Sequence, residues 1–251
     1  MADKEYGNDF ALAHKYVIIW IRRKNPEWRI IMAPRASFEY ELTILNNNLR
    51  DMGTLIEAAI DKVIKAFENE DEALATEIIR GDRTINDMER VIESRCLSLI
   101  LRQQPVAKDL RIVTTALKVV TDMERIGDHA ADISELILRN IKQNTYTIVK
   151  AIPKMAEVAK EMVHDAVEAF IACDTEKARV TIKKDDIVDE LFNEVKSTVI
   201  EAMRNSGENA DSYIDILMIA KYMERIGDHA VNICEWTEFH ETGSLNNVRI
   251  L

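Results

Sequence analysis

Acidic side chains recur at the spacing of one helical turn in two places along the chain. The first run holds Glu124, Asp128 and Asp132, and the second holds Glu224 and Asp228 with the neutral amide Asn232 at the third position. Residues four apart lie on one face of a helix, where like charges repel by roughly 0.2–0.5 kcal/mol per pair. We therefore expect a bound cation or a basic neighbour beside each run.

A second helix should bring further oxygen-bearing side chains to each run. Two antiparallel helices joined by a tight turn place residues equidistant from that turn side by side. Each half of the chain is thus expected to bring four oxygen donors to one level of a helical hairpin. The expected pairs are Asp82 with Asp128 and Asn86 with Glu124 about Pro105, and Asp185 with Asp228 and Asp189 with Glu224 about Ser206-Gly207.

Carboxylate and amide oxygens are hard ligands, and these pairs contain no other donor. They suit Mg, Mn, Ca or iron better than copper or structural zinc. Helical bundles commonly hold such ions between facing helices. His129 and His229 each follow an aspartate directly, so each points about 100° away from it around the helix. We expect these histidines to be hydrogen-bonding neighbours and not ligands.

The alternative is that arginine side chains neutralise the acidic runs without a metal. Arg125 and Arg225 each follow the glutamate of their run and could form salt bridges along the helix. For a single run this alternative would be preferred, but two mirrored pairs in two copies favour metal. Arg125, Arg225, Asp132 and Asn232 are expected to surround the ligands.

The chain contains an internal repeat. Met-Glu-Arg-Ile-Gly-Asp-His-Ala occurs at 123–130 and again at 223–230, 100 residues later, while Asp82 and Asp185 are matched 103 residues apart. In a unit duplicated only for packing, apolar residues should be kept best, yet this segment is polar. Apolar residues recur at helical spacing elsewhere. The sequence predicts an all-α protein of two three-helix units, with helices at 38–68, 71–104, 106–141, 150–172, 174–205 and 209–238.

The composition excludes several classes of protein. A formal net charge of −11 would repel a nucleic acid backbone, so a general DNA or RNA binder is not expected. No stretch reaches the roughly 18 apolar residues of a membrane span, and no signal peptide is evident. We therefore expect a cytoplasmic protein. Cys96, Cys173 and Cys234 form no CxxC pair and are expected to be buried, reduced thiols.

Residues 1–35 stand apart from the repeat. They hold Trp20 and Trp28, a break at Pro26 and no sustained helical period. Two interpretations stay open: a native N-terminal extension, or a start codon placed too far upstream, with Met32 as an internal start. We assign no function to this segment.

Three motifs stand out. They are Gln-Pro-Val-Ala-Lys-Asp-Leu-Arg at 104–111, Asp82-x-x-x-Asn86-x-Met88-Glu89, and the two copies of Met-Glu-Arg-Ile-Gly-Asp-His-Ala. In these motifs the chain resembles the PhoU family, the phosphate-transport accessory and signalling proteins of prokaryotes. The resemblance spans about residues 36–240 and implies two tandem three-helix bundles. The first repeat would occupy 36–145 and the second 146–240, between the N-terminal extension and a C-terminal tail at 241–251.

The resemblance also implies metal ions. The family's E(D)xxxD motifs bind clusters of iron or other divalent metals, so Fe, Mn, Mg or Zn is implied here, with multinuclear clusters included. Asn86 departs from the pattern because the second half has Asp189 there, so the first site should bind metal more weakly or hold fewer ions. By motif, the ligands fall on Glu124 and Asp128, and on Glu224 and Asp228 with Asp185 and Asp189 opposite.

The function implied by the resemblance is that of a non-enzymatic negative regulator of phosphate homeostasis. The family implies homodimers, contacts with the phosphate ABC transporter and a sensor histidine kinase, and membrane association only through those partners. A second hypothesis is a carboxylate-bridged metalloenzyme of unknown substrate. A third is a helical adaptor whose acidic runs are neutralised by salt bridges.

Overall fold

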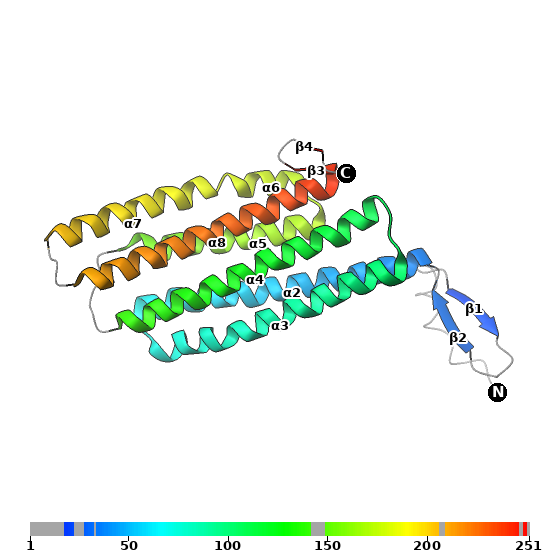
Figure 1. The fold of residues 1–251 in the computed structure, drawn as a ribbon, viewed down its shortest axis with the longest axis horizontal. Coiled ribbons are helices and arrows are strands. Elements are labelled where there is room, and N and C mark those ends of the chain that lie inside the picture. The colour runs from blue at the N-terminus through cyan, green and yellow to red at the C-terminus, as the bar shows by residue number, and fades with distance from the viewer. Residues whose placement is uncertain are drawn as a thin grey trace, which may run out of the picture.

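The computed structural model describes residues 18–22, 28–32, 34–141, 149–205, 209–245 and 248–249. Within these residues the chain forms seven helices and two small antiparallel sheets of two strands each. As predicted, the fold is all-α, with two tandem three-helix bundles (Figure 1).

The first bundle contains three long helices, and the second repeats them with one interruption. α2, α3 and α4 form the first bundle; α5, α6 with α7, and α8 form the second. The bounds are α2 (Pro34–Asn69), α3 (Glu72–Gln103), α4 (Lys108–Asn140), α5 (Ala151–Ala172), α6 (Thr175–Ile182), α7 (Asp185–Asn205) and α8 (Ala210–Thr242).

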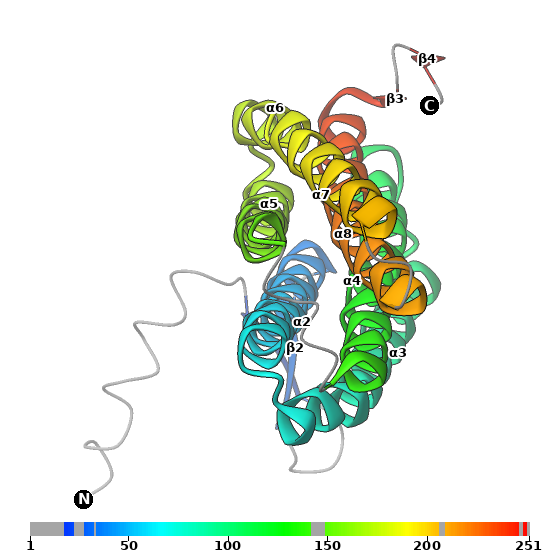
Figure 2. The same ribbon diagram turned by 90° about the vertical axis from the view of Figure 1, so that its left-hand side faces the viewer.

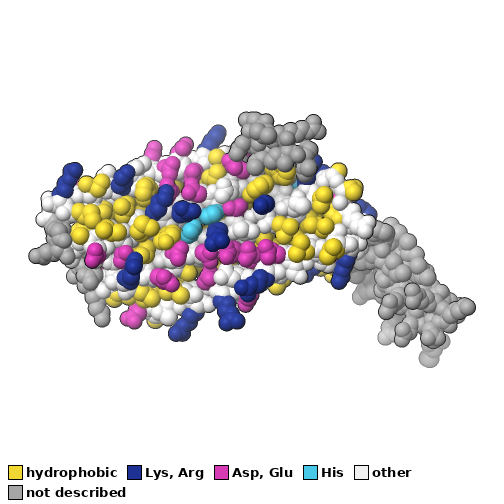
Figure 3. Space-filling view, in the orientation of Figure 1, with side chains coloured by type: hydrophobic (Ala, Val, Ile, Leu, Met, Phe, Trp, Pro, Cys, Tyr) yellow, Lys and Arg dark blue, Asp and Glu magenta, His cyan; other side chains and the backbone are white. Residues whose placement is uncertain are grey.

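The helices lie in two layers. Figure 2 shows α2 and α5 in one layer and α3, α4, α8 and α7 in the other. α4 and α8, which carry the repeated octapeptide, lie side by side in the middle of the larger layer. Buried apolar side chains such as Ile56, Met123, Met162 and Met223 fill the core. Figure 3 shows the outer face of the four-helix layer, where charged side chains lie among exposed hydrophobic ones.

Matched caps begin the second helix of both bundles. Asp71 accepts a hydrogen bond from the Leu74 amide at 3.0 Å, and Asp174 accepts one from the Lys177 amide at 2.9 Å. A carboxylate at this position satisfies one of the unpaired amides of the first helical turn. At its other end α3 stops before Pro105, which cannot continue a helix. The turn expected at Ser206-Gly207 lies outside the described residues.

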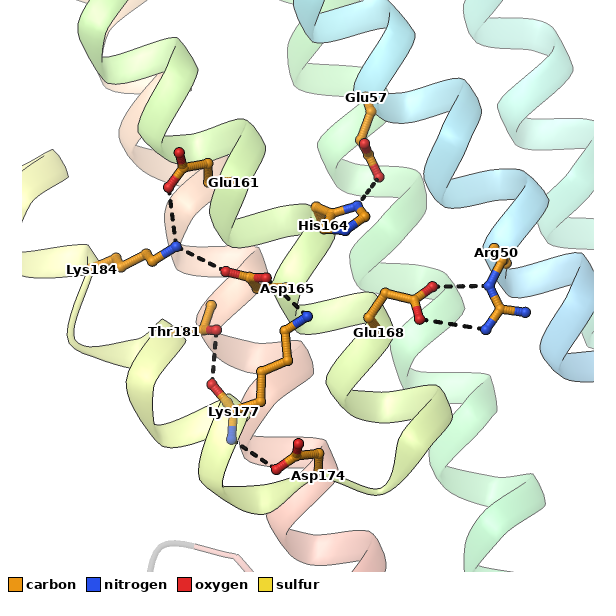
Figure 4. Close-up of polar contacts among 10 residues, drawn as sticks. All are labelled: Arg50, Glu57, Glu161, His164, Asp165, Glu168, Asp174, Lys177, Thr181 and Lys184. Atoms are coloured by element: carbon orange, nitrogen blue, oxygen red, sulfur yellow. Dashed lines mark hydrogen bonds and ion pairs between the residues drawn. The ribbon is translucent and has the colours of Figure 1, made fainter.

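The helix expected at 174–205 is interrupted, and this part of the prediction is wrong. α6 and α7 are separated by a turn in which the Lys184 amide donates to the Thr181 carbonyl at 2.9 Å. The Lys184 ammonium is held by two carboxylates of α5, as Figure 4 shows. The counterpart of Lys184 in the first bundle is Gly81, which has no side chain to anchor, and α3 continues there. The interruption places Asp185 in the first turn of α7.

The N-terminal segment contains strands that the sequence did not predict. β1 (Ile18–Arg22) pairs with β2 (Trp28–Met32) in an antiparallel hairpin. A second short hairpin, β3 (Ser244–Leu245) with β4 (Val248–Arg249), follows α8. The other residues of 1–33 and the expected repeat boundary at 145 lie outside the described residues.

The cysteines differ from expectation at one position. Cys96 and Cys234 are buried, but Cys173 is exposed. Cys173 is the residue that ends α5, with a left-handed backbone (φ 56°), so it lies in a surface turn. Its Sγ is 3.3 Å from Nδ1 of the buried His240.

Candidate metal centres

Both acidic clusters predicted from the sequence lie between paired helices of the larger layer. Figure 3 shows acidic side chains gathered near the middle of the outer face, close to histidine side chains. We call the cluster between α3 and α4 site 1 and the cluster between α7 and α8 site 2. Site 1 contains Asp82, Asn86, Glu89, Glu124 and Asp128, and site 2 contains Asp185, Asp189, Glu224 and Asp228.

In site 1 the structure brings Asp82 of α3 close to Asp128 of α4. Burial and the charge of Asp128 raise the pKa of Asp82, and the same two causes raise the pKa of Glu124. Asn86 Nδ2 donates to Asp82 Oδ2 at 2.9 Å. The other oxygens of these two side chains, Asp82 Oδ1 and Asn86 Oδ1, are buried without a hydrogen-bond partner among the described residues. Both oxygens are therefore available to a cation.

Glu89 is a member of site 1 that the pairing of residues about Pro105 does not predict. Its pKa is raised first by burial and then by the charge of Glu124, so it lies close to that carboxylate. It follows Asn86 by three residues, which places both on one side of α3. The spacing could have identified it, but its counterpart in the second repeat is Phe192. Site 1 thus has four carboxylates in addition to Asn86.

Arg125 neutralises part of site 1, as the alternative hypothesis required. Its Nη1 is 2.9 Å from Asp128 Oδ2, and its Nε is 3.4 Å from Glu124 Oε2. The arginine side chain is 55% exposed, so this pairing is weak and screened by solvent. Arg225 is exposed and forms no ion pair with another described residue of site 2. The two repeats therefore neutralise their carboxylates differently.

In site 2 the most perturbed group is Asp185. Burial, followed by the charges of Asp189 and Asp228, raises its pKa to about 6. Its Oδ1 is buried and has no hydrogen-bond partner among the described residues. Gly227 lies against this oxygen, since a Cβ at that position would come within 3.1 Å of it. The glycine of the repeated octapeptide therefore leaves room for the Asp185 carboxylate.

A lysine enters site 2 that has no equivalent in site 1. Lys221 forms an ion pair with Glu224, and its ammonium lies 5.5 Å from the centre of the Phe192 ring. The counterparts in the first repeat are Thr121 and Glu89. The expectation that the second site is the richer in negative charge therefore needs revision. Each site has four carboxylates and one basic side chain paired with them, Arg125 in site 1 and Lys221 in site 2.

The two histidines lie at the contact between the repeats, and among the described residues neither forms a hydrogen bond with a carboxylate of site 1 or site 2. His229 Nδ1 is 2.9 Å from Asp122 Oδ1, and Asn232 donates to the same oxygen at 3.1 Å. His129 Nδ1 is 3.4 Å from Asp132 Oδ2, and the two imidazole rings are 5.5 Å apart. Asn232, expected around the ligands, thus serves the contact between α4 and α8. Asp132 contacts His129 of its own helix, and after burial and the charge of Asp128 its charge also raises the pKa of Asp82, so Asp132 lies near site 1 as expected. Asp122 was not predicted, because its counterpart is Tyr222.

The donor chemistry of both sites fits a hard divalent cation, since every donor is an oxygen. In the described part of the chain, no three acidic, imidazole or thiol side chains already converge on one ion position. A cation would have to draw the carboxylates inward and displace Arg125 in site 1 or Lys221 in site 2. Burial is the main cause of the raised pKa values of Asp82 and Asp185, and the charges of the neighbouring carboxylates in each site add to it. A bound cation would relieve the part that comes from those charges.

Comparison with known proteins matches both halves of the chain to one family. The model of the PhoU domain matches residues 49–137 and again 152–237. A Clostridium acetobutylicum protein, named phosphate-specific transport system accessory protein PhoU homolog, is 38% identical over 210 residues, which cover 83% of this chain and 96% of that protein. The Escherichia coli accessory protein PhoU is 30% identical over 208 residues, covering 83% and 86%. The chain therefore belongs to the PhoU family.

Solved structures agree with this assignment. The crystal structure of PhoU from Pseudomonas aeruginosa has a TM-score of 0.76 at 29% identity, covering 82% of this chain and 100% of that one. The regulatory protein PhoU from Streptococcus pneumoniae has a TM-score of 0.78 at 28% identity, covering 83% and 98%. Family members are named as accessory and regulatory proteins and not as enzymes. No helix in the described ranges is long and apolar enough to cross a membrane.

Proposed function

We propose that this chain regulates phosphate uptake and phosphate-starvation signalling through protein contacts in the cytoplasm. The observation that carries the proposal is the family match over both repeats, to relatives named as accessory proteins of the phosphate-specific transport system. Regulation of phosphate transport is the part that those names support directly. The finer parts are negative regulation, action as a homodimer, and contacts with the phosphate ABC transporter and a sensor histidine kinase.

We further propose that sites 1 and 2 hold iron or other divalent ions. The support is the set of oxygen donors on facing helices, with buried unbonded oxygens at Asp82, Asn86 and Asp185. When bound, the metal supplies positive charge to a surface that is otherwise acidic. A bound metal would hold the carboxylate side chains inward, and this would change the charge that a partner protein meets on the outer face.

A pull-down experiment tests the protein contacts. The full chain would be immobilised and exposed to the purified transporter ATPase and, separately, to the cytoplasmic part of the sensor kinase, each at high and low phosphate. We expect binding of both partners to be stronger at high phosphate. The same pull-down with the double variant Glu224→Ala and Asp228→Ala shows whether site 2 contributes to the binding of either partner.

Retention of neither partner would contradict the regulator proposal. If the site 2 variant retains the partners as well as the wild type does, regulation by protein contacts stays supported. Site 2 would then have no role in those contacts. The metalloenzyme alternative receives no support from the relatives, whose names describe accessory and regulatory proteins.

A further inference from the structure

Lys184 ties the start of α7 to α5, and the residue that follows it is the site 2 aspartate Asp185. The Lys184 ammonium lies 2.8 Å from Asp165 Oδ2 and 3.1 Å from Glu161 Oε2, as Figure 4 shows. The side chain of Lys184 is 26% exposed and that of Asp165 is 25% exposed, so this pair is better shielded from water than an ordinary surface ion pair. We call Lys184, Glu161 and Asp165 the α5 clamp.

Asp165 also binds α6, so one carboxylate holds both sides of the interruption. The ammonium of Lys177, on α6, is 3.0 Å from Asp165 Oδ1. Burial by itself would raise the pKa of Asp165, but the hydrogen bonds from Lys184 and Lys177 lower that pKa below its usual value. The Lys184 amide donates to the Thr181 carbonyl at 2.9 Å. Side-chain and main-chain contacts together therefore fix the backbone that leads into Asp185.

The first bundle folds without such a clamp. The counterparts of Lys184, Glu161 and Asp165 are, in that order, Gly81, Ala58 and Lys62. These counterparts line a hollow of about 220 Å³ between α2 and α3, and α3 continues through Gly81 without a break. A three-helix bundle of this kind therefore packs without the interruption, and packing alone does not explain why the second bundle has the clamp.

The seam between the paired helices differs where the clamp is present. In the first bundle the three atoms nearest to a Cβ placed on Gly127 all belong to Ile85. In the second bundle the atom nearest to a Cβ on Gly227 is Asp185 Oδ1 at 3.1 Å, an oxygen that is buried without a hydrogen-bond partner among the described residues. Val188, the counterpart of Ile85, is farther away at 3.7 Å. The carboxylate of Asp185 thus lies in the seam at the place that an apolar side chain holds in the other bundle.

We propose that Lys184 is a positioning residue of site 2: held by the two carboxylates of α5, it keeps the Asp185 carboxylate in the seam between α7 and α8 for the cation. The inference rests on the proposed function, in which site 2 holds a divalent cation, and it adds the residues outside the site that set its geometry. Residues that orient a metal ligand commonly change metal affinity by roughly 10–100-fold. Site 1 has no such clamp, and Asn86 of the same helix binds its Asp82 instead.

Mn²⁺ titration of the full chain separates positioning from simple charge. The background Asp82→Ala with Asp128→Ala removes site 1, so that only site 2 responds. In this background Lys184→Met keeps a long side chain but breaks the clamp, and it should weaken Mn²⁺ binding by roughly tenfold or more. The control Lys183→Met, at the exposed neighbour, removes the same charge and should not weaken binding. A lysine that acted only through its charge would repel the cation, so its loss would tighten binding.

Two further variants connect the effect to the clamp. Lys184→Arg keeps a cation for the carboxylates of α5 and should retain most of the affinity. Asp165→Ala, on α5 and outside site 2, should weaken Mn²⁺ binding as Lys184→Met does, and the two changes together should cost little more than either alone. Hydrogen exchange in EDTA gives a readout without metal. The Ile187 amide, which donates to the Lys184 carbonyl at 3.0 Å, should exchange faster in Lys184→Met than in Lys183→Met.

Unchanged or tighter Mn²⁺ binding in Lys184→Met would overturn the proposal and leave site 2 in place as a metal site. An equal loss of affinity in Lys183→Met would also overturn it, because the loss would then not depend on the clamp. If the background chain itself binds no Mn²⁺ at site 2, the proposed metal site is contradicted, and the positioning role with it.

Discussion

Asp185 carries a carboxylate into a half-buried position among other carboxylates. Burial and the neighbouring carboxylates raise its pKa to about 6 in the folded chain, from an ordinary value of 3.8. The folded form holds this proton more tightly than the unfolded form does. The resulting contribution of Asp185 to stability is therefore fully present below about pH 4, and it is lost as the pH rises through about 6. At neutral pH the ionised Asp185 therefore opposes folding when no cation is present.

Asp185→Asn should stabilise the metal-free protein at high pH. Discounting for partial exposure, we expect the free energy of unfolding to rise by about 1–2 kcal/mol at about pH 8 and to change little at about pH 4. Urea titration in the presence of EDTA measures both values. An equal effect at the two pH values would show that the charge of Asp185 is not the cause.

Glu89 provides a second test at the residue scale. Glu89→Gln removes one of four carboxylates from site 1 and should weaken Mn²⁺ binding there by roughly tenfold. Calorimetric titration should use a background of Glu224→Ala with Asp228→Ala, so that only site 1 responds. Glu77→Gln, an exposed carboxylate on the same helix, is the control. Unchanged affinity in Glu89→Gln would exclude Glu89 from the site.

Among the helices, the glycine of the repeated octapeptide sets how closely the two helices of each site approach. In site 1 a Cβ on Gly127 would lie 2.9 Å from Ile85 Cγ2, and Ile85 is buried. In site 2 a Cβ on Gly227 would lie 3.1 Å from Asp185 Oδ1. The same glycine thus packs against a core side chain in one bundle and against a candidate ligand in the other.

Substitution of these glycines by alanine should have different effects. Gly127→Ala should destabilise the protein by about 1–3 kcal/mol through overpacking, although alanine is the better helix former by about 1 kcal/mol. Gly227→Ala should cost less stability, because the Asp185 side chain can move, but should weaken cation binding at site 2. Thermal melts and metal titrations separate the two effects. The reverse pattern would contradict the packing described for the two bundles.

The long helices could be predicted because apolar residues recur at helical spacing. The pairs of residues that face each other across two helices could be predicted because they lie equally far from the turn between those helices. The interruption before α7 could not, since lysine is a good helix former and the turn depends on carboxylates of α5 that hold Lys184. Comparison of the repeats pointed to the residues that both halves keep. It therefore passed over Glu89 and Lys221, which differ between the halves and change the charge of each site.

Across the whole molecule, the contact between α4 and α8 joins the two repeats and lies between the two sites. Asp122 of α4 accepts hydrogen bonds from Asn232 and pairs with His229, both of α8. Ion pairs between α2 and α5, such as Arg50 with Glu168 at 2.9 Å, hold the other layer together (Figure 4). The repeats are therefore joined in both layers.

Asp122→Ala should weaken the joint between the repeats. The change leaves His229 and Asn232 without their acceptor, and we expect a loss of about 1–3 kcal/mol in the free energy of unfolding. Asp132→Ala, which removes the longer contact to His129, should cost less and serves as the comparison. Urea unfolding followed by circular dichroism measures both. A larger loss for Asp132→Ala would contradict the described contact.

In the proposed account, each repeat holds cations between its paired helices. The most direct measurement is the metal content of the full chain, purified without added ions, by mass spectrometry. Wild type should retain iron or another divalent metal, and both Asp82→Ala with Asp128→Ala and Glu224→Ala with Asp228→Ala should lose roughly half of it and melt at a lower temperature. Two results together would contradict this account: a wild-type protein without stoichiometric metal, and variants that melt at the same temperature as the wild type.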